Sequence, residues 1–451
     1  MKRVTLTTAT VVTLSWAGSA LSGTLSVPSE FATIQAAVDA AASGDTVLVA
    51  SGTYTGTGNK NINPGSKELV IQSESGATAT IIDCEGSGRA LYVAGGQSEA
   101  FVFQGFTVRN GLTTNASGVL VDPIDSSITI RDCLFEGCDS GGPVAAVRGR
   151  GRLLNSKIIG CDGYWAFMWH GGVIDQLEVI GNSAKSGSVD ADEAVTVTNS
   201  VFVDNDGRLY ITAPHTVQMS NCVIQSSFAL EWAADLYPSL MENCTVIGEI
   251  QAVCAPVLTF RNCILNSDTG CGDLEVYWGQ LTLECCRYDP STVYEDGELV
   301  EVGPQVYADP EFCGESGCLI SYVPGSLALS DTSPCLAENS PCGERIGAFD
   351  LGCGVASVDE SLGGTGHQID FVSAMPTAGP VRFELRGVSA ELLEAEVIAS
   401  DGRVVLAESL RRSGDSFQTS SLDGLSSGVY FLRVQLDGGE TLGRKFVRVS
   451  R

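Results

Sequence analysis

The chain has 451 residues, a formal net charge of −28 and 44% hydrophobic residues. Residues 371–451 contain ten basic and ten acidic residues, so the whole negative excess lies in residues 1–370. Such a surface repels nucleic acids and anionic lipids, and it excludes a polyanion as a simple electrostatic ligand unless cations such as calcium bridge the two. No later apolar run reaches the roughly 18 residues of a membrane span, so we predict no transmembrane helix.

The N-terminus has the pattern of a secretory signal peptide. Lys2 and Arg3 precede an apolar, threonine-rich run, and small residues follow at 17–22. We therefore assign residues 1–23 to a signal peptide and expect export. Sixteen cysteines fit an oxidising destination, and the eight between residues 271 and 353 predict a disulfide-stapled segment. Three histidines and no zinc-type cysteine spacing argue against a structural zinc site.

The mature chain begins with a predicted capping helix. Apolar residues recur at helical spacing in residues 29–42, and Ser29 is the expected N-cap. Residues 46–50 then predict a buried strand. A helix placed here would cover the open end of a stack of strands. Further short strands, separated by Gly and Asn and by no helical stretch, are predicted at residues 68–75, 79–83, 90–95 and 100–111.

A repeat of about 22 residues follows. Its clearest copy is VQMSNCVI at residues 217–224, in which apolar residues alternate up to an Asn-Cys pair. A fixed period with two or three short strands per repeat predicts one coil of a parallel β-helix. Coils stack at about 4.8 Å, so the dozen coils between Leu25 and Asp289 would form a rod of about 55 Å. The residues after the corner are Cys133, Ser156, Leu177, Ser200, Cys222, Cys244, Cys263 and Cys285, spaced by 19 to 23 residues.

Residues at equal offsets in successive coils line up as ladders along the axis of the stack. The asparagines before the register residues would form a ladder at the corner, with amides bonding along the stack. The following cysteines would point inward, as buried free thiols in the favoured interpretation and as disulfides between adjacent coils in the alternative. The asparagines are Asn155, Asn199, Asn221, Asn243 and Asn262.

Several stretches carry a family resemblance. FATIQAAVDAAASGDTVLVASGTY, FQGFTVRNG and the Asn-Cys repeats resemble right-handed parallel β-helix proteins of the pectin-lyase-like superfamily. ADPEFCGESGCL and SPCLAENSPCGERIGAFDLGC resemble the closing segment of exported bacterial members. The resemblance covers residues 24–354 and implies an all-β solenoid fold. It leaves function open, because this fold hosts lyases, hydrolases, esterases and adhesins.

The C-terminal part predicts a second, smaller domain. Residues 355–370 form a Ser- and Gly-rich linker, and residues 371–451 alternate as strands with hairpin signals at Asp401-Gly402 and Asp437-Gly438. About 80 residues of this kind form a small β-sandwich. The stretches DGR, GVYF and KFV resemble the C-terminal sorting domain of type IX secretion cargo, although Met375-Pro376-Thr377 departs from that family's Pro-Asn-Pro entry motif. Similar sequences occur in Ig-like domains of the flagellar hook-capping type. The resemblance implies that this domain is a targeting signal recognised by the secretion machinery.

One flank of the solenoid collects residues suited to carbohydrate. Offsets 9 to 15 from the register residues hold aromatic rings, carboxylates and two histidines, the mix that sugar rings and hydroxyls require. Asp190 and Asp235 would lie about 10 Å apart, at the long limit for an inverting glycosidase. In the alternative, the carboxylates are solvated turn residues and Trp169 and Tyr210 belong to the core. The candidate ligand-binding residues are Trp165, Trp169, His170, Asp190, Asp192, Tyr210, His215, Trp232, Asp235 and Tyr237.

Motif searches leave two main functional classes. The catalytic signatures of polygalacturonases, pectate lyases and pectin esterases are absent from the sequence. We therefore expect a secreted or cell-surface protein that binds polysaccharide or another surface polymer without catalysis. The alternatives are a divergent polysaccharide lyase or glycoside hydrolase, and a structural surface-layer or adhesin component. No cofactor is predicted, with calcium at Asp204 and Asp206 as an alternative that lacks the usual closing Glu.

Overall fold

The computed structural model describes most of the chain, and all structural statements below concern the described residues. The described ranges are 22–122, 126–190, 192–213, 215–234, 237–254, 258–266, 273–313, 326–349, 351–353, 368–371, 381–386, 392–399, 404–412, 416–420, 422, 428–435 and 441–448. The predicted signal peptide, apart from Ser22 and Gly23, and most of the predicted linker lie outside them.

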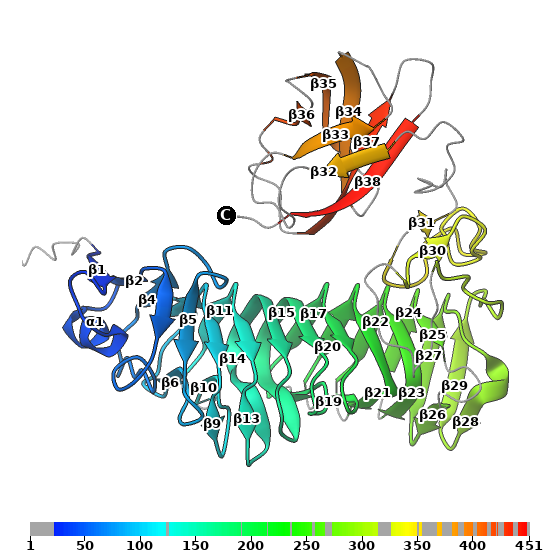
Figure 1. Cartoon of the computed structure of the whole chain (residues 1–451). Helices are drawn as coiled ribbons and strands as arrows, with labels where there is room; N and C mark the ends of the chain where they lie inside the picture. The colour runs from blue at the N-terminus through cyan, green and yellow to red at the C-terminus, as the bar shows by residue number, and fades with distance from the viewer. Residues whose placement is uncertain are drawn as a thin grey trace, which may run out of the picture.

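Residues 24–302 form a parallel β-solenoid of about 12 turns (Figure 1). Each turn contributes to three sheets, and strands pair in parallel with the equivalent strand of the next turn. One continuous apolar core fills the interior between the three sheets. This confirms the predicted all-β parallel solenoid.

The first sheet is the one on which the candidate site lies. Its strands are β6 (Leu91–Val93), β10 (Val119–Val121), the start of β14 (Val144–Ile159), the start of β15 (Trp165–Ile180), β16 (Gly187–Asp190), β19 (Leu209–Ala213), the end of β21 (Val223–Ala234), the end of β23 (Thr245–Cys254), β26 (Leu274–Tyr277) and β28 (Val293–Glu295).

The second sheet precedes the Asn corner in each turn. Its strands are β1 (Thr24–Val27), β2 (Thr46–Val49), β4 (Val70–Ser73), β7 (Val102–Gln104), β11 (Ile128–Arg131), the middle of β14 and β15, β17 (Val195–Thr198), β20 (Val217–Ser220), β22 (Ser239–Glu242), β24 (Leu258–Arg261), β27 (Gln280–Glu284) and β29 (Glu298–Val302).

The third sheet follows the corner. It contains β3 (Gly52–Tyr54), β5 (Thr80–Asp83), β8 (Thr107–Arg109), β12 (Leu134–Glu136), the ends of β14 and β15, β18 (Val201–Val203), the starts of β21 and β23, and β25 (Ile264–Asn266). Short elements beside the sheets are β9 (Leu112–Thr113), β13 (Asp139–Ser140), the 3-10 helix η1 (Pro290–Thr292), β30 (Leu329–Ser330) and β31 (Leu351–Cys353).

The corner between the second and third sheets explains the repeated asparagine. All five predicted ladder asparagines have a left-handed backbone, with φ between 42° and 54°. Asn tolerates this conformation better than most residues, because its short polar side chain bonds locally. The amides bond differently from the prediction, however. Asn155 donates to Asp132 and Asn199 donates to Asp175, so carboxylates of the preceding turn replace the expected amide-to-amide bonds.

The residues after the corner point inward, as predicted. Cys222, Cys244 and Cys263 are fully buried and are free thiols, which confirms the favoured interpretation over interturn disulfides. The last turn differs from the prediction. Arg261 pairs with Glu284, so Cys285 takes the left-handed corner position and Cys286 is the buried register residue. In the Glu284-Cys285-Cys286 sequence, either cysteine could follow the corner. The pairing of β27 with β24 places Cys286 there.

A second ladder lies where the third sheet turns toward the first. The Asn182 side chain accepts from the Cys161 backbone N–H at 2.9 Å and donates to Asn205 Oδ1 at 2.8 Å. Asn205 in turn donates to Ser186 Oγ and to the Val179 carbonyl. These buried amides satisfy one another along the axis, which a buried polar group requires.

The N-terminal helix is shorter than predicted. Helix α1 spans Ile34–Ala40 and is capped by Thr33, whose hydroxyl accepts from the Ala36 N–H at 3.2 Å. Ser29 is therefore not the N-cap, because Glu30 and Phe31 both donate to the Ser26 carbonyl and form a turn. The apolar face of α1 still covers the end of the core, since Ile34, Ala37 and Val38 are buried.

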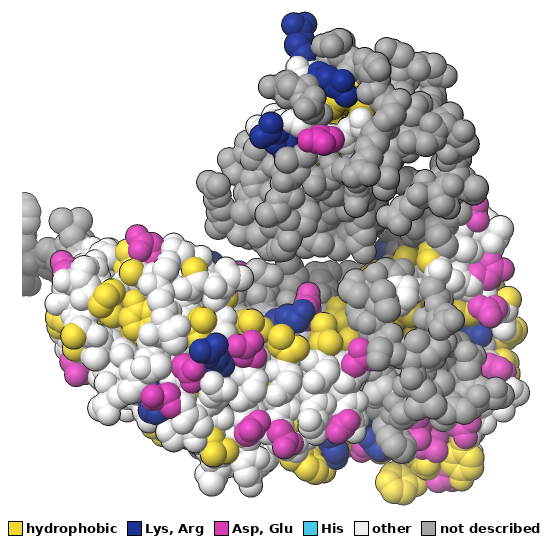
Figure 2. Space-filling view, viewed as in Figure 1, with side chains coloured by type: hydrophobic (Ala, Val, Ile, Leu, Met, Phe, Trp, Pro, Cys, Tyr) yellow, Lys and Arg dark blue, Asp and Glu magenta, His cyan; other side chains and the backbone are white. Residues whose placement is uncertain are grey.

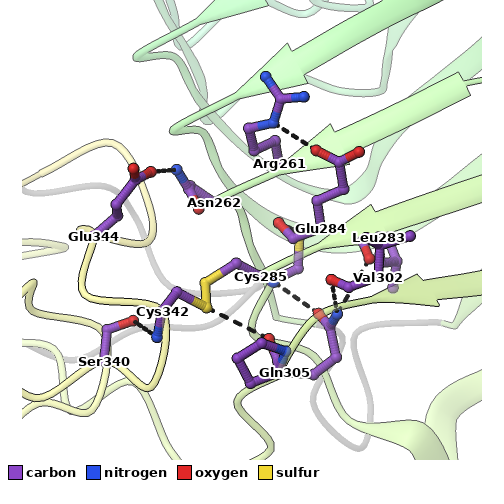
Figure 3. The surroundings of a disulfide bond; sticks show 12 residues. Arg261, Asn262, Leu283, Glu284, Cys285, Val302, Gln305, Ser340, Cys342 and Glu344 are labelled. Atoms are coloured by element: carbon purple, nitrogen blue, oxygen red, sulfur yellow. Dashed lines mark hydrogen bonds and ion pairs between the residues drawn. A yellow bond between two sulfur atoms is a disulfide. The ribbon is translucent and has the colours of Figure 1, made fainter.

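The Cys-rich segment packs on the outer side of the third sheet, where Leu327 clusters with Val203 and Val223 and Ile346 clusters with Ile264. A disulfide joins Cys285 at the corner to Cys342 of this segment (Figure 3). Beyond it the segment follows the corner backward, because Glu344 accepts from Asn262 at 2.7 Å and Ala348 N–H donates to Thr245 at 3.0 Å. Cys313 is also disulfide-bonded, whereas Cys335 is free and buried, and Cys271 and Cys318 lie outside the described residues.

The C-terminal part forms two antiparallel sheets around its own core, as a β-sandwich predicts. One sheet contains β32 (Gln368–Phe371), β33 (Arg382–Arg386) and β36 (Phe417–Gln418). The other contains β35 (Val404–Arg411), β34 (Leu392–Ala399), β37 (Gly428–Gln435) and β38 (Thr441–Arg448). The two predicted hairpin turns lie outside the described residues, but the strands on either side of each turn pair as a hairpin requires.

Candidate functional site

The candidate residues lie on the first sheet and on the loops that follow its strands. Met168, Ser188 and Tyr210 stand in register on successive turns, on the outer side of the sheet; Met168 and Tyr210 are partly exposed and Ser188 is buried. The next residues along each strand face inward. This alternation, which follows from the pleat of a strand, separates the candidates into surface and core residues.

Trp169 and Trp232 belong to the core. Both side chains are fully buried, in register with Val189 and Ile211 between them. Trp169 and Asp190 each follow a register residue, Ser156 and Leu177, by 13 residues, which predicts that they stand opposite each other, but the strand register pairs Trp169 with Val189. Turns of unequal length shift the offset by one residue, and a shift of one residue moves a side chain to the other face of the sheet. The alternative interpretation was therefore right for Trp169 and wrong for Tyr210.

Trp165 and Tyr210 form an aromatic pair on the surface side. Their rings stack with centroids 5.6 Å apart across the small Ser188, and Tyr164 meets Trp165 edge-on at 4.9 Å. Lys185 lies over both Tyr164 and Trp165 and donates to the Tyr164 hydroxyl at 2.7 Å. Tyr164 is 55% exposed, whereas Trp165 is buried beside it, so Tyr164 is the ring of this cluster that meets solvent.

His170, Asp190 and Asp192 come together, as the sequence predicted. Nδ1 of the buried His170 lies 3.2 Å from an Asp192 carboxylate oxygen and 3.8 Å from one of Asp190. The Nδ1 atom has no partner in hydrogen-bond geometry. On the other side of the ring, Arg148 Nε donates to Nε2 at 3.3 Å. Arg148 was missed in the sequence, although extending the ladder by one turn from Met168 reaches it.

The Arg148 contact decides the protonation of His170. Because Nε2 accepts a hydrogen bond, the neutral ring carries its proton on Nδ1 and points it toward the two carboxylates. Burial, followed by the Arg148 charge, lowers the pKa of His170, while the carboxylates raise it by less. The imidazole is therefore neutral at pH 7.

This protonation state argues against a metal ion. Among the described residues, His170, Asp190 and Asp192 are the group whose ligand atoms, all within 4.8 Å of one another, could hold a metal. A metal at Nδ1 would have to displace the Nδ1 proton and give Nε2 a proton facing the Arg148 N–H. The Arg148 guanidinium would also repel the cation. The donor set thus resembles a metal site in composition but does not fit one.

Asp190 and Asp192 differ in environment. Burial is the main cause that raises the pKa of Asp190, and the Asp192 charge adds to it. Asp192 is the more exposed of the two carboxylates. Both face the same imidazole from one side, rather than facing each other across a gap that could hold a scissile bond.

The remaining candidates form a separate pair. His215 and Tyr237 stack with centroids 5.3 Å apart, and Tyr237 is 46% exposed. Asp235 lies outside the described residues. Between Asp204 and Asp206, the residues of the calcium alternative, the Asn205 amide is engaged in the buried ladder.

A polar network continues along the outer face and was not found in the sequence. Arg208 contacts Glu231 and donates to Gln251 Oε1 at 2.6 Å. Gln251 donates to both Glu249 and Glu275, at 2.9 and 2.8 Å. The signal was available, since Glu231, Gln251 and Glu275 continue the Met168–Ser188–Tyr210 register toward the C-terminal end.

Comparisons with known proteins agree with this architecture. Residues 69–287 match the family model of the right handed beta helix region, and residues 375–449 match that of the secretion system C-terminal sorting domain. A search of curated proteins finds no match. Within the described residues, no helix is long and apolar enough to cross a membrane.

Proposed function

Because the chain combines a right-handed β-helix with a C-terminal secretion sorting domain that indicates export to the cell surface or beyond, we propose that it binds polysaccharide on the outer face of its first sheet, without catalysis. The observation that carries the proposal is the aromatic cluster of Tyr164, Trp165 and Tyr210, with Tyr164 exposed, in the turns that flank Asp190 and Asp192. Ring faces stack on sugars, and carboxylates accept hydrogen bonds from hydroxyl groups.

The geometry favours binding over hydrolysis. Glycosidases place two carboxyl groups on either side of the scissile bond. Here the carboxylate oxygens of Asp190 and Asp192 lie within 4.8 Å of each other and of one histidine nitrogen, on the same side of the ring. The His170 ring is held by Arg148 and buried, so it cannot reach a substrate proton.

One observation favours the enzymatic alternative. The raised pKa of Asp190 is a property of general acids, and Asp192 beside it stays available as a partner carboxylate. A divergent hydrolase would then release reducing ends, whereas a lyase would release unsaturated products. Incubating the protein with plant and algal polysaccharides and assaying both signals tests this alternative, and we expect neither signal.

The binding proposal is tested by retention on a polysaccharide panel. We expect the variant with Tyr164→Ala and Tyr210→Ala to lose about tenfold in affinity, which corresponds to ~1.4 kcal/mol. Tyr307→Ala is the matched control, because Tyr307 is 51% exposed but packs against Tyr288 elsewhere. Equal retention of the double variant, or retention on no polysaccharide, would contradict the proposal, and the second outcome would favour a structural role.

A further inference from the structure

Three aromatic residues form an exposed surface at the C-terminal end of the first sheet. We call Tyr277, Trp278 and Tyr294 the aromatic platform. The Tyr277 ring lies between the other two, with centroids 5.9 Å from Tyr294 and 6.5 Å from Trp278. Trp278 is 72% exposed and Tyr294 is 53% exposed. Exposed aromatics scattered singly are ordinary, but three contiguous rings on one face indicate a binding surface.

The backbone at Trp278 supports a functional interpretation. Its φ is 42°, in the left-handed region that bulky residues rarely adopt. Asn or Gly would fit this position with less strain, and the side chain buries too little surface to compensate. Such strain is retained where a residue has a role beyond stability. The Trp278 ring is therefore held outward at a conformational cost.

Carboxylates surround the platform. Tyr277 donates to Glu275 at 3.1 Å, and Gln251 links Glu275 to Glu249. Asp273 is exposed beside them and adds to the negative charge that, after burial, raises the pKa of Glu249. The nearby Arg208 is engaged by Glu231 and Gln251. Figure 2 shows hydrophobic and acidic side chains together at this lower end of the solenoid, over β26 and β28.

We infer that the aromatic platform and its acidic rim bind an amino-sugar polymer whose free amino groups are protonated, such as a chain of β-linked glucosamine. The inference rests on the proposed function and names a substrate class for it. Ring faces accept the apolar faces of the sugars, and ammonium groups gain from both the carboxylates and the ring quadrupoles.

The negative charge of the acidic rim argues against the other classes of ligand. A uronic-acid polymer would meet Glu249, Glu275 and Asp273 with like charge, and a second copy of the chain would bring its own excess of negative charge. An apolar protein partner would desolvate the rim carboxylates without replacing their hydrogen bonds, which is unfavourable. A cationic glycan satisfies the rings and the carboxylates together.

The test measures binding of a glucosamine hexamer and of its fully N-acetylated counterpart to the exported protein by calorimetry. We expect tighter binding of the glucosamine hexamer, a fall in its affinity of at least tenfold in Trp278→Asn, and a further fall at high salt. The double change Glu249→Gln and Glu275→Gln should weaken the glucosamine hexamer and leave the acetylated one unchanged. Tyr307→Ala is the control and should bind normally. Because Asn fits the left-handed backbone, Trp278→Asn should unfold at the same temperature as the parent or higher.

Equal affinity for the two hexamers, or unchanged binding by Trp278→Asn, would overturn the inference. If another polysaccharide is retained and the retention depends on Tyr164 and Tyr210, the proposed function stands and only the inference fails. If no polysaccharide is retained at all, both fail.

Discussion

The corner between the second and third sheets and the outer face of the first sheet follow opposite rules. At the corner, Asn199, Asn221 and Asn243 repeat one backbone conformation turn after turn, and each is followed by a buried small residue. On the outer face, paired residues of successive turns differ in size, polarity and charge, as in the series Met168, Ser188, Tyr210 and Glu231. The repeat therefore marks positions dictated by the backbone and the core, and the proposed binding residues occupy positions that the repeat leaves free.

The largest expected effect on stability distinguishes a core residue of the first sheet from an exposed residue on its outer face. Trp169→Ala should lower the free energy of unfolding by about 3–5 kcal/mol, because a fully buried indole leaves a cavity. Trp278→Ala is the exposed control and should change it by less than about 0.5 kcal/mol. Urea unfolding followed by circular dichroism measures both. A small loss for Trp169→Ala would show that this residue does not belong to the core.

The next effect concerns the Cys-rich segment. Cys285→Ser should destabilise the solenoid by about 2–4 kcal/mol, because the disulfide to Cys342 closes a long loop in the unfolded chain. Cys342→Ser should have the same effect, and the double variant should lose no more than either single one. Thermal unfolding under non-reducing conditions measures the series, and additive losses would contradict a shared bond.

A smaller effect tests the corner itself. Asn243→Ala should cost about 1 kcal/mol, because Ala adopts the left-handed backbone at φ 52° less readily than Asn. Asn243→Gly should cost less, since Gly has no Cβ to oppose that conformation. Chemical denaturation of the two variants is the measurement. Equal losses of stability for Asn243→Ala and Asn243→Gly would show that the left-handed backbone does not dictate the residue at the corner.

The smallest effect is a pH dependence on the outer face. Burial and Arg148 lower the pKa of His170 below its ordinary value of 6.5. The unfolded state therefore binds the proton first, so the stabilisation is present above pH 6.5 and is lost as the pH falls through the folded pKa. Asp190 has the opposite sign, because its pKa is raised and its contribution is lost as the pH rises.

His170→Gln isolates the histidine contribution. The slope of the unfolding free energy between pH 7 and 5 should become shallower in this variant. Asp192→Asn should steepen the slope, because it removes a charge that raises the pKa of His170 and so lowers that pKa further. Urea unfolding at several pH values measures both slopes. Identical slopes in parent and His170→Gln would show that His170 titrates normally.

Much of the fold was predictable from the sequence, because the repeat reports on the backbone. The Asn-Cys pairs predicted the corner and the inward register, and the cysteine cluster predicted a disulfide-stapled segment. The N-cap at Thr33 and the choice between Cys285 and Cys286 were missed, since each depends on a local hydrogen bond or pairing that competes with an equally plausible neighbour.

The candidate site was less predictable. His170, Asp190 and Asp192 were grouped correctly, because they lie in adjacent turns. Trp169 and Trp232 were placed on the wrong face, since a one-residue slip in the register inverts a strand. Arg148 and Tyr294 of the aromatic platform lay in the same ladder but beyond the turns that the offsets compared.

The Cys285–Cys342 bond also determines how the solenoid carries mechanical load. The sorting domain is joined to the chain beyond residue 342, so a pull from a surface-held C-terminus travels along the Cys-rich segment to that cysteine. There the covalent link passes the force directly to Cys285 on the second-sheet corner. Residues 286–341 are bypassed, and the last turn cannot be peeled away strand by strand. A glycan held on the flank and an anchor at the C-terminus would thus be connected through covalent bonds and stacked turns.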